Sequence, residues 1–323
     1  MSGPIVVVGD VLLDRDVTGV ADRLCPDAPV PVLTELSSVE RAGGAGLAAS
    51  FLAHDGAEVV LIGAVGPDAA GQRVRGLLSA AGVELLPIGY DGTTPEKIRL
   101  RSGRHPLLRL DRGVTVGTYG DLPARASAAL RAASAVLVSD YGRGVTGLAG
   151  LRRLLTEVTG RTPMVWDPHP RGATPVPGVR VACPNRGEAA GFAAAHGADL
   201  NGRPVPDPEA VAAQARLLRG AWRASAVAVT LGPGGALVVE SYGAPASVPA
   251  PVSHHGDTCG AGDRFAATTA LSLAGGVRVR DAVGAAVESA SRYVASDGPA
   301  NLISLFAHPE IAGSDTIAME AAT

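Results

Sequence analysis

The stretch GDTCGAGD, which ends at Asp263, places three glycines and two aspartates directly before an alanine-rich run. Gly260 and Gly262 allow a turn that points successive backbone N–H groups at one spot. A helix beginning at Ala261 would add the positive end of its dipole there. Such a site binds an anion, and Asp263 in the first helical turn is placed to accept a proton from an attacking hydroxyl. The pattern predicts phosphoryl transfer; the alternative is a glycine-rich helix start without a ligand, since short glycine motifs are weakly specific.

Composition narrows the class of protein around this motif. The 323 residues carry a net charge of −3, with 46% hydrophobic and 18% charged residues, enough for a large buried core. No Lys/Arg run suggests nucleic acid as a ligand, and no apolar run reaches the roughly 18 residues of a membrane span. The cysteines, Cys25, Cys183 and Cys259, lie far apart, and the start lacks a basic signal region. We therefore expect a cytoplasmic protein.

Short apolar runs alternate with alanine-rich stretches along most of the chain. The strands are expected at 4–10, 58–63, 135–139, 163–167, 179–183, 226–231 and 236–240. The helices are expected at 43–56, 68–81, 121–133, 147–158, 187–196, 261–274 and 281–295. This order predicts an α/β fold, a doubly wound and mostly parallel sheet with helices on both faces. Ligands bind such sheets at the carboxyl ends of the strands, where Asp10, Asp140, Asp167 and Asn185 fall.

Two segments break the alternation and suggest a small β-structured lid over the main sheet. Residues 28–41 are extended and proline-containing, as in an edge strand. Residues 96–113 read as strand, turn and strand, with Lys97, Arg99 and Arg101 on one face. We expect one domain over 1–308 with lid segments at about 12–41 and 92–114, followed by a polar tail over 309–323.

Three further motifs accompany D-T-x-G-A-G-D, which spans 257–263. They are N-x-x-E at 185–188, the turn TLGPGGALVV at 230–239, and RAGGAGLAAS at 41–50. Together these motifs resemble the ribokinase-like (phosphofructokinase B) family of sugar kinases, and the resemblance covers nearly the whole chain.

The resemblance implies an ATP- and Mg²⁺-dependent sugar kinase. It assigns Asp263 as the catalytic base and the backbone of Gly260, Ala261 and Gly262 as the anion hole. The residues it implies for ATP are Asn185, Glu188, Thr230, Gly232, Gly235 and Asp257, with Mg²⁺ near Glu188.

The order of the lid and loop motifs most resembles the branch of the family that phosphorylates the anomeric hydroxyl of a heptose 7-phosphate, giving the 1,7-bisphosphate. The substrate contacts implied are Asp10, Asp14, Gly43, Gly44, Lys97, Arg99, Arg104 and Asp140. The chain's single lysine lies among the lid cations, as suits an anionic substrate; a solvated β face over 97–104 is the alternative. The resemblance also implies a homodimer through the lid, and a separate nucleotidyltransferase downstream because the chain ends before such a domain.

Two departures from the family pattern leave alternatives open. Leu47 stands where the family has a sugar-binding Asn, and Val287 stands where an Asn is usual. The acceptor could therefore be ribose or a fructose phosphate instead of a heptose phosphate. A kinase-like binding module that has lost turnover is a further alternative, against which Asp263 and N-x-x-E both argue.

Overall fold

The protein was analysed as a computed structural model that describes residues 3–103, 105–113, 117–197, 207–251 and 256–298. The expected tail, 309–323, and Arg104 lie outside the described residues. Among the described helices, none combines the length and the apolar character needed to cross a bilayer.

One large sheet forms the centre of the molecule, and most of its strands are parallel. Its order is β12 (Ala246–Val248), β11 (Ala236–Glu240), β10 (Ala226–Thr230), β9 (Val181–Ala182), β8 (Met164–Asp167), β7 (Ala135–Ser139), β1 (Ile5–Cys25), β3 (Val59–Ala64) and β4 (Val83–Ile88). Neighbouring strands pair in parallel from β10 to β4, whereas β11 and β12 are antiparallel additions at one edge. The mostly parallel sheet confirms the expected α/β class.

Helices cover both faces of this sheet, and the alternation of side chains along the strands gives each face its own core. Val7 faces a layer made by α1 (Ala45–His54), α2 (Ala69–Ala80), α7 (Ala261–Ala274) and α8 (Val279–Ala295). Val6 and Val8 face the layer of α3 (Ala126–Ala132), α4 (Ala149–Val158), α5 (Arg186–Ala195) and α6 (Pro208–Ala221). Both sides of the central strand are therefore buried, which explains its run of valines.

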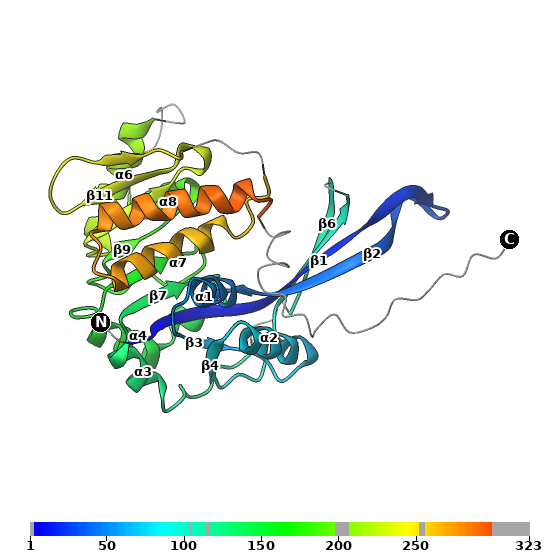
Figure 1. The fold of residues 1–323 in the computed structure, drawn as a ribbon, viewed down its shortest axis with the longest axis horizontal. Helices are drawn as coiled ribbons and strands as arrows, with labels where there is room; N and C mark the ends of the chain where they lie inside the picture. The colour runs from blue at the N-terminus through cyan, green and yellow to red at the C-terminus, as the bar shows by residue number, and fades with distance from the viewer. Residues whose placement is uncertain (1–2, 104, 114–116, 198–206, 252–255, 299–323) are drawn as a thin grey trace.

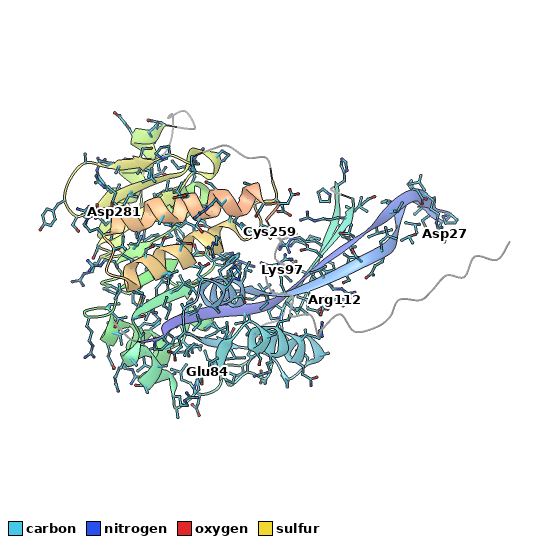
Figure 2. The ribbon with its side chains drawn as sticks, viewed as in Figure 1. Asp27, Glu84, Lys97, Arg112, Cys259 and Asp281 are labelled. Carbon is cyan, nitrogen blue, oxygen red and sulfur yellow. The ribbon has the colours of Figure 1, made fainter. Side chains whose placement is uncertain are left out.

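The lid is a second sheet that shares β1 with the first. The β1–β2 ribbon (β2, Ala28–Gly44) projects from the body, and β5 (Glu96–Ser102) and β6 (His105–Arg112) extend it on the other side of β1 (Figure 1). Asp27 lies at the far end of this arm, and Lys97 lies where the lid meets the body (Figure 2). The lid strands therefore reach over the carboxyl ends of the main sheet.

The expected strand at 4–10 was wrong at its end, because β1 continues through Asp10 to Cys25. An aspartate within an apolar run normally marks the end of a buried strand. Here three backbone N–H groups from the 141–145 loop donate hydrogen bonds to the Asp10 carboxylate, so the strand can continue. The sequence analysis also did not identify β4, β12 or α6. The other expected elements agree with the structure to within a few residues at their ends, the expected helix at 121–133 starting later, at Ala126.

Candidate active site

The start of α7 forms the centre of the site, and its geometry depends on glycine. Gly260 has a φ of 85°, and a Cβ there would lie 2.9 Å from the Tyr293 hydroxyl and 3.0 Å from Leu47. The Tyr293 hydroxyl donates a hydrogen bond of 2.8 Å to the carbonyl of Cys259, which fixes the same loop. A larger residue at 260 would therefore strain the backbone and clash on two sides.

The N–H groups available to an anion lie in the first turn of α7. The N–H of Ala261 donates to the carbonyl of Thr258 at 3.0 Å, so it serves the turn itself. The N–H groups of Gly262 and Asp263 have no intrahelical acceptor at this end of the helix. A Cβ at Gly262 would meet nothing within 4 Å, and Gly262 lines open pocket space at this helix start. The amides of Gly262 and Asp263 are therefore the ones that could bind an anion at this helix N-terminus, while the predicted anion hole of Gly260, Ala261 and Gly262 stays a prediction.

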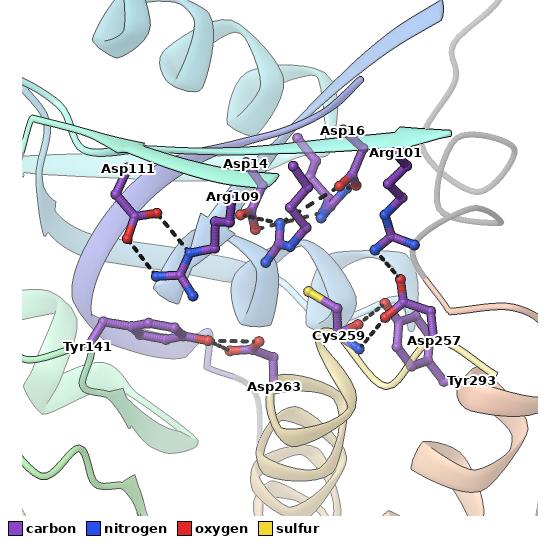
Figure 3. Close-up of polar contacts among 12 residues, drawn as sticks. Asp14, Asp16, Arg101, Arg109, Asp111, Tyr141, Asp257, Cys259, Asp263 and Tyr293 are labelled. Carbon is purple, nitrogen blue, oxygen red and sulfur yellow. Dashed lines mark hydrogen bonds and ion pairs between the residues drawn. The ribbon is translucent and has the colours of Figure 1, made fainter. Parts of the chain in front are cut away.

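Asp263 lies at this helix start with only 5% of its surface exposed. The Tyr141 hydroxyl donates to both of its carboxylate oxygens, at 2.7 and 2.8 Å (Figure 3). Burial raises the pKa of Asp263 to about 7, although the hydrogen bond from Tyr141 and the charge of Lys97 act in the opposite direction. A carboxylate with a pKa near the working pH is suited to accept and release a proton.

The Tyr141→Phe substitution should move the pH dependence of the reaction. Without the hydroxyl, the carboxylate form of Asp263 loses a hydrogen bond, so the pKa of Asp263 should rise further above its ordinary value. The acid limb of the kcat/KM profile should then shift upward by about one pH unit, as loss of roughly 1.4 kcal/mol of hydrogen bonding implies. Steady-state rates of wild type and Tyr141→Phe between pH 5 and 9 measure this, and superimposable profiles would contradict it.

The expected substrate residue Asp10 serves the backbone of the loop that carries Tyr141. Its carboxylate accepts hydrogen bonds from the N–H groups of Tyr141, Arg143 and Val145, at 3.0, 2.9 and 3.2 Å. Burial raises the pKa of Asp10, and the nearby charge of Asp140 adds to this effect. Asp10 therefore positions the loop beneath the site.

Asp140 has a similar role at the other end of the same loop. Its carboxylate accepts from the N–H of Gly142 at 2.7 Å, the hydroxyl of Thr146 at 2.5 Å and the N–H of Ala173 at 3.0 Å. A Cβ at Gly172 would lie 2.1 Å from this carboxylate, so the chain passes unusually close to it. These contacts hold Asp140 within the protein, although it also lines the pocket described below.

The base of the lid is a buried group of opposite charges. Arg41 pairs with Asp16 through a short hydrogen bond and lies 3.8 Å from Asp14. Arg99 donates to Asp14 at 2.9 Å and lies 3.9 Å from Asp16. Burial lowers the pKa of Arg99, but the carboxylates of Asp14 and Asp16 outweigh it, so the pKa rises overall. The expected substrate residues Asp14 and Arg99 are thus brought together, each as the other's partner.

The expected glycines 43 and 44 allow the end of β2 to approach β1. A Cβ at Gly43 would lie 2.6 Å from the Asp14 carboxylate. Gly44 has a φ of 60°, and a Cβ there would lie 2.4 Å from the carbonyl oxygen of Asp10. These glycines leave room around both aspartates.

Lys97 lies on the lid side of the candidate catalytic base, Asp263. Its ammonium lies 4.7 Å from the centroid of the Tyr141 ring, a cation–π contact. Burial lowers the pKa of Lys97, while the nearby carboxylates of Asp14 and Asp263 oppose this. The lysine therefore brings positive charge to the side of the site where Asp263 lies.

A second contact joins the lid to the loop before α7. Arg101 on β5 donates to Asp257 at 2.5 Å. This pair helps to lower the pKa of Asp257, although burial alone would raise it. Asp257, which the family resemblance assigns to ATP binding, is therefore bound to the lid and also caps the N–H of Cys259 at 2.9 Å.

Two adjoining pockets meet at the start of α7. The first encloses about 740 Å³ of space, part of which is open to solvent. Its walls are mainly apolar and include the expected nucleotide turn; they comprise Thr230, Gly232, Pro233, Gly235, Ala250, Thr258, Ala261, Gly262, Phe265, Val287, Ala290, Ser291 and Val294. Val287, a departure from the family pattern, contributes apolar surface to this wall.

The second pocket is more polar and contains the candidate base. It is lined by Asp140, Tyr141, Asp167, Pro168, His169, Cys183, Asn185, Glu188, Thr230, Gly260, Gly262, Asp263 and Phe265. Thr230, Gly262 and Phe265 line both pockets. A molecule with an apolar ring system and an anionic chain could therefore extend from one pocket into the other past the amide of Gly262.

Asn185 and Glu188 form a capping box at the start of α5. The Asn185 side chain accepts from the N–H of Glu188 at 3.0 Å, and Glu188 accepts from the N–H of Asn185 at 2.8 Å. A bridge between Asn185 and Thr230 places this motif beside the nucleotide turn. The motif thus caps a helix and lines the polar pocket at the same time.

The residues of the polar pocket fit a magnesium ion held partly by phosphates. Burial raises the pKa of Glu188 and raises that of Asp167 well above its usual value, and the two carboxyls interact. Among the described residues, no cluster of three or more His, Cys, Asp or Glu side chains offers a complete metal site. Mg²⁺ commonly uses one or two carboxylates, water and substrate phosphates, so Glu188 with Asp167 suits it.

Sequence reasoning missed several residues of this site. Tyr141, Arg41, Asp16 and Arg109 were in the quoted motifs or their neighbours but were not selected, whereas Asp167 was placed at the ligand-binding end of its strand without a role. Arg41 is the last residue of the expected edge strand, and a buried partner for Asp14 could have been sought there. Nothing in the sequence indicates that the Tyr141 hydroxyl would reach Asp263, which lies 122 residues later.

Known proteins resemble this chain over most of its length. A family model described as pfkB family carbohydrate kinase matches residues 3–304. The bifunctional protein HldE of Streptomyces coelicolor is 52% identical over 298 residues, which cover 92% of this chain and 61% of that protein. The bifunctional protein HldE of Caulobacter vibrioides is 36% identical over 284 residues, or 86% of this chain and 57% of that protein. This chain therefore spans about three fifths of the length of these relatives.

Solved structures share the fold at low sequence identity. Escherichia coli phosphofructokinase-2, in complex with substrates and products, gives a TM-score of 0.66 at 18% identity, covering 90% of this chain and 93% of that chain. Arabidopsis thaliana ribokinase, complexed with ribose and ATP, gives a TM-score of 0.65 at 18% identity, covering 95% and 99%. These similarities agree with the arrangement of sheet, helices and lid described above.

Proposed function

The chain belongs to the pfkB family of carbohydrate kinases, and from this premise we propose that it transfers the γ-phosphoryl group of ATP to a sugar phosphate. The observation that supports this most directly is the position of Asp263. It is buried at the helix start in the polar pocket, next to Gly262, which lines both pockets, and its pKa is about 7. A group of this kind can accept the proton of the attacking hydroxyl beside amides that stabilise the transferred phosphoryl group.

The other residues of the site would bind ATP and hold Asp263 in position. The apolar pocket would hold the nucleoside, and the N–H groups of Gly262 and Asp263 would donate to the phosphoryl oxygens. Tyr141 would hold the Asp263 carboxylate in place until the acceptor hydroxyl arrives. Mg²⁺, held through Glu188 and Asp167, would neutralise charge on the phosphates of ATP.

The acceptor we propose is a heptose 7-phosphate, phosphorylated at its anomeric hydroxyl. Two observations support it: the order of the motifs, which resembles heptose 7-phosphate kinases, and the lid cations that face the site. Leu47 is buried against the Gly260 loop, so at this position apolar packing replaces the family's hydroxyl contact. A nucleotidyltransferase that acts on the product stays a prediction.

The experiment that tests this function is ADP release from Mg-ATP over a panel of acceptors. The panel contains heptose 7-phosphates, fructose phosphates, ribose and a nucleoside, with an Asp263→Asn variant as the blank. Turnover confined to a heptose 7-phosphate would support the full proposal. Turnover on an unphosphorylated sugar would keep the kinase and reject the acceptor, and no turnover on any acceptor would reject the activity.

We also propose that two copies associate through the lid in the cytoplasm. The β1–β2 arm exposes Val20, Leu24, Val30 and Leu36, with 43 to 70% of each accessible, on strands that a second copy could cover. All three cysteines are free, as a reducing compartment favours. Light scattering after size exclusion should give twice the chain mass, and Leu36→Asp should lower it; a monomeric wild type would contradict the proposal.

A further inference from the structure

The lid face that looks onto Asp263 carries charged side chains in two rows across the strands. In the first row, Arg41, Asp14, Lys97 and Asp111 are register partners across β2, β1, β5 and β6. Partners in adjacent strands share a face, so positive and negative charges alternate along this row. Each charge therefore has an opposite neighbour.

The second row breaks this alternation. Asp16 on β1 is the partner of Arg99 on β5, and Arg99 is the partner of Arg109 on β6. Two arginines thus lie directly opposite each other, an arrangement that destabilises a sheet unless an anion lies between them. The charge of Arg99 opposes the other influences that raise the pKa of Arg109.

The two arginines differ in how firmly they are held. Arg99 is partly buried and bound to Asp14 at 2.9 Å, with 19% of its side chain exposed. Arg109 has 56% of its side chain exposed and pairs with Asp111 two residues along the same strand, at 2.8 and 2.6 Å. An exposed pair of this kind contributes only about 0–1 kcal/mol. Arg109 can therefore exchange Asp111 for a stronger anion at little cost.

The position of Arg109 suits one end of an acceptor whose other end meets Asp263. Figure 3 shows Arg109 and Asp111 extending from the lid above Tyr141 and Asp263. Lys97 is nearby, because it is the register partner of Asp111 and its ammonium lies 4.7 Å from the centroid of the Tyr141 ring. Planar guanidinium groups bind phosphate through two parallel hydrogen bonds, which carboxylate–arginine pairs such as Arg109–Asp111 imitate.

We propose that Arg109 binds the phosphate monoester of the acceptor in place of Asp111, and so determines the preference for phosphorylated over unphosphorylated sugars. Arg99 and Lys97 complete the positive side of this phosphate site. The inference rests on the proposed function, since it concerns the acceptor of the same reaction. It adds a residue outside those that the family motifs assigned, and it gives Asp111 the role of holding Arg109 when no acceptor is bound.

The test compares Arg109→Gln with Arg112→Gln, a matched control on the same strand. Arg112 alternates to the opposite face of β6 and is also exposed. We expect Arg109→Gln to raise the KM for heptose 7-phosphate, and its Kd by calorimetry, about 30-fold, the loss of a charged hydrogen-bonded contact. The KM for ATP and the Kd for unphosphorylated heptose should stay within about twofold. Asp111→Asn, which frees Arg109, should lower the KM for heptose 7-phosphate severalfold.

Equal Kd values for heptose 7-phosphate in Arg109→Gln and Arg112→Gln would overturn the inference while leaving the kinase intact. So would a loss of affinity in Arg109→Gln that is the same for phosphorylated and unphosphorylated heptose. If wild type shows no turnover but binds heptose 7-phosphate in an Arg109-dependent way, the proposed function fails and the phosphate site stands.

Discussion

In the Asp263→Asn variant we expect phosphoryl transfer to fall by about 10²- to 10⁴-fold, while the Kd for ATP changes by less than about threefold. Asparagine has nearly the same shape, and its side-chain oxygen can still accept the hydrogen bond of Tyr141. It cannot take a proton from the acceptor hydroxyl. The helix amides and both pockets stay in place, so nucleotide binding should survive. Steady-state kinetics and ATP titration of the same preparation measure the two effects.

Asp281→Asn is the matched control, because Asp281 is the third residue of α8 as Asp263 is of α7. Asp281 is exposed and pairs with Arg278 at the surface, so its substitution should leave turnover near wild type.

Asp263→Asn should be at least as stable as wild type above pH 7. Burial disfavours the ionised carboxylate, and the pKa of Asp263 in the folded state is therefore raised to about 7. Above that pH the wild type must bury a negative charge that asparagine does not carry. Comparable turnover in Asp263→Asn and wild type would reject Asp263 as the base.

Replacing Arg41 by Met should lower the free energy of unfolding by about 3 kcal/mol. Only 6% of Arg41 is exposed, and 4% of Asp14, so the substitution leaves the carboxylates of Asp14 and Asp16 with less positive charge around them, supplied by Arg99 and, for Asp14, also by Lys97. Chemical denaturation followed by circular dichroism gives the change at constant pH.

Arg73→Met provides the comparison for this effect. Arg73 also pairs with a glutamate of β2, Glu40 at 2.7 Å, but 57% of its side chain is exposed. Its loss should cost about 0–1 kcal/mol. Equal losses in the free energy of unfolding for the two substitutions would mean that burying the ion pairs of Arg41 with Asp14 and Asp16 does not make them more important for stability than the exposed pair.

The parts of the site that sequence reasoning predicted are those set by local chain geometry. Asp263 and the glycines before it lie within one turn and one helix start, so a short pattern determines their mutual arrangement. The lid was also predictable as β structure, because alternation placed Lys97, Arg99 and Arg101 on one face. The role of each residue within this face was not.

The contacts that escaped prediction join residues distant in sequence. Asp10 appeared to end a strand, but its carboxylate is satisfied by amides more than 130 residues later, and the strand continues. Asp14 and Arg99 were each expected to meet substrate, which stays a prediction, but their ion pair with each other, set by the register of β1 with β5, was not foreseen. Arg109 faces Arg99 only because of the β5–β6 register. Such pairings depend on tertiary register, which periodicity alone does not determine.

The continuity of β1 has a mechanical consequence for the whole molecule. A lid that is joined to the body by loops can move as a rigid unit. This lid is built on an extension of the central strand, so it can move only if that strand bends. The irregularities in the β1–β2 pairing all lie outward of Thr18, at Thr18/Gly19, Val20/Arg23 and Leu24/Cys25. The pairing is therefore regular beside Asp14 and Asp16 and irregular toward the tip, where we expect the arm to bend more easily. Bending at the tip would then leave the geometry around Asp14 and Asp16 almost unchanged. The inner part of the lid would stay aligned with the sheet whatever the outer end of the arm contacts.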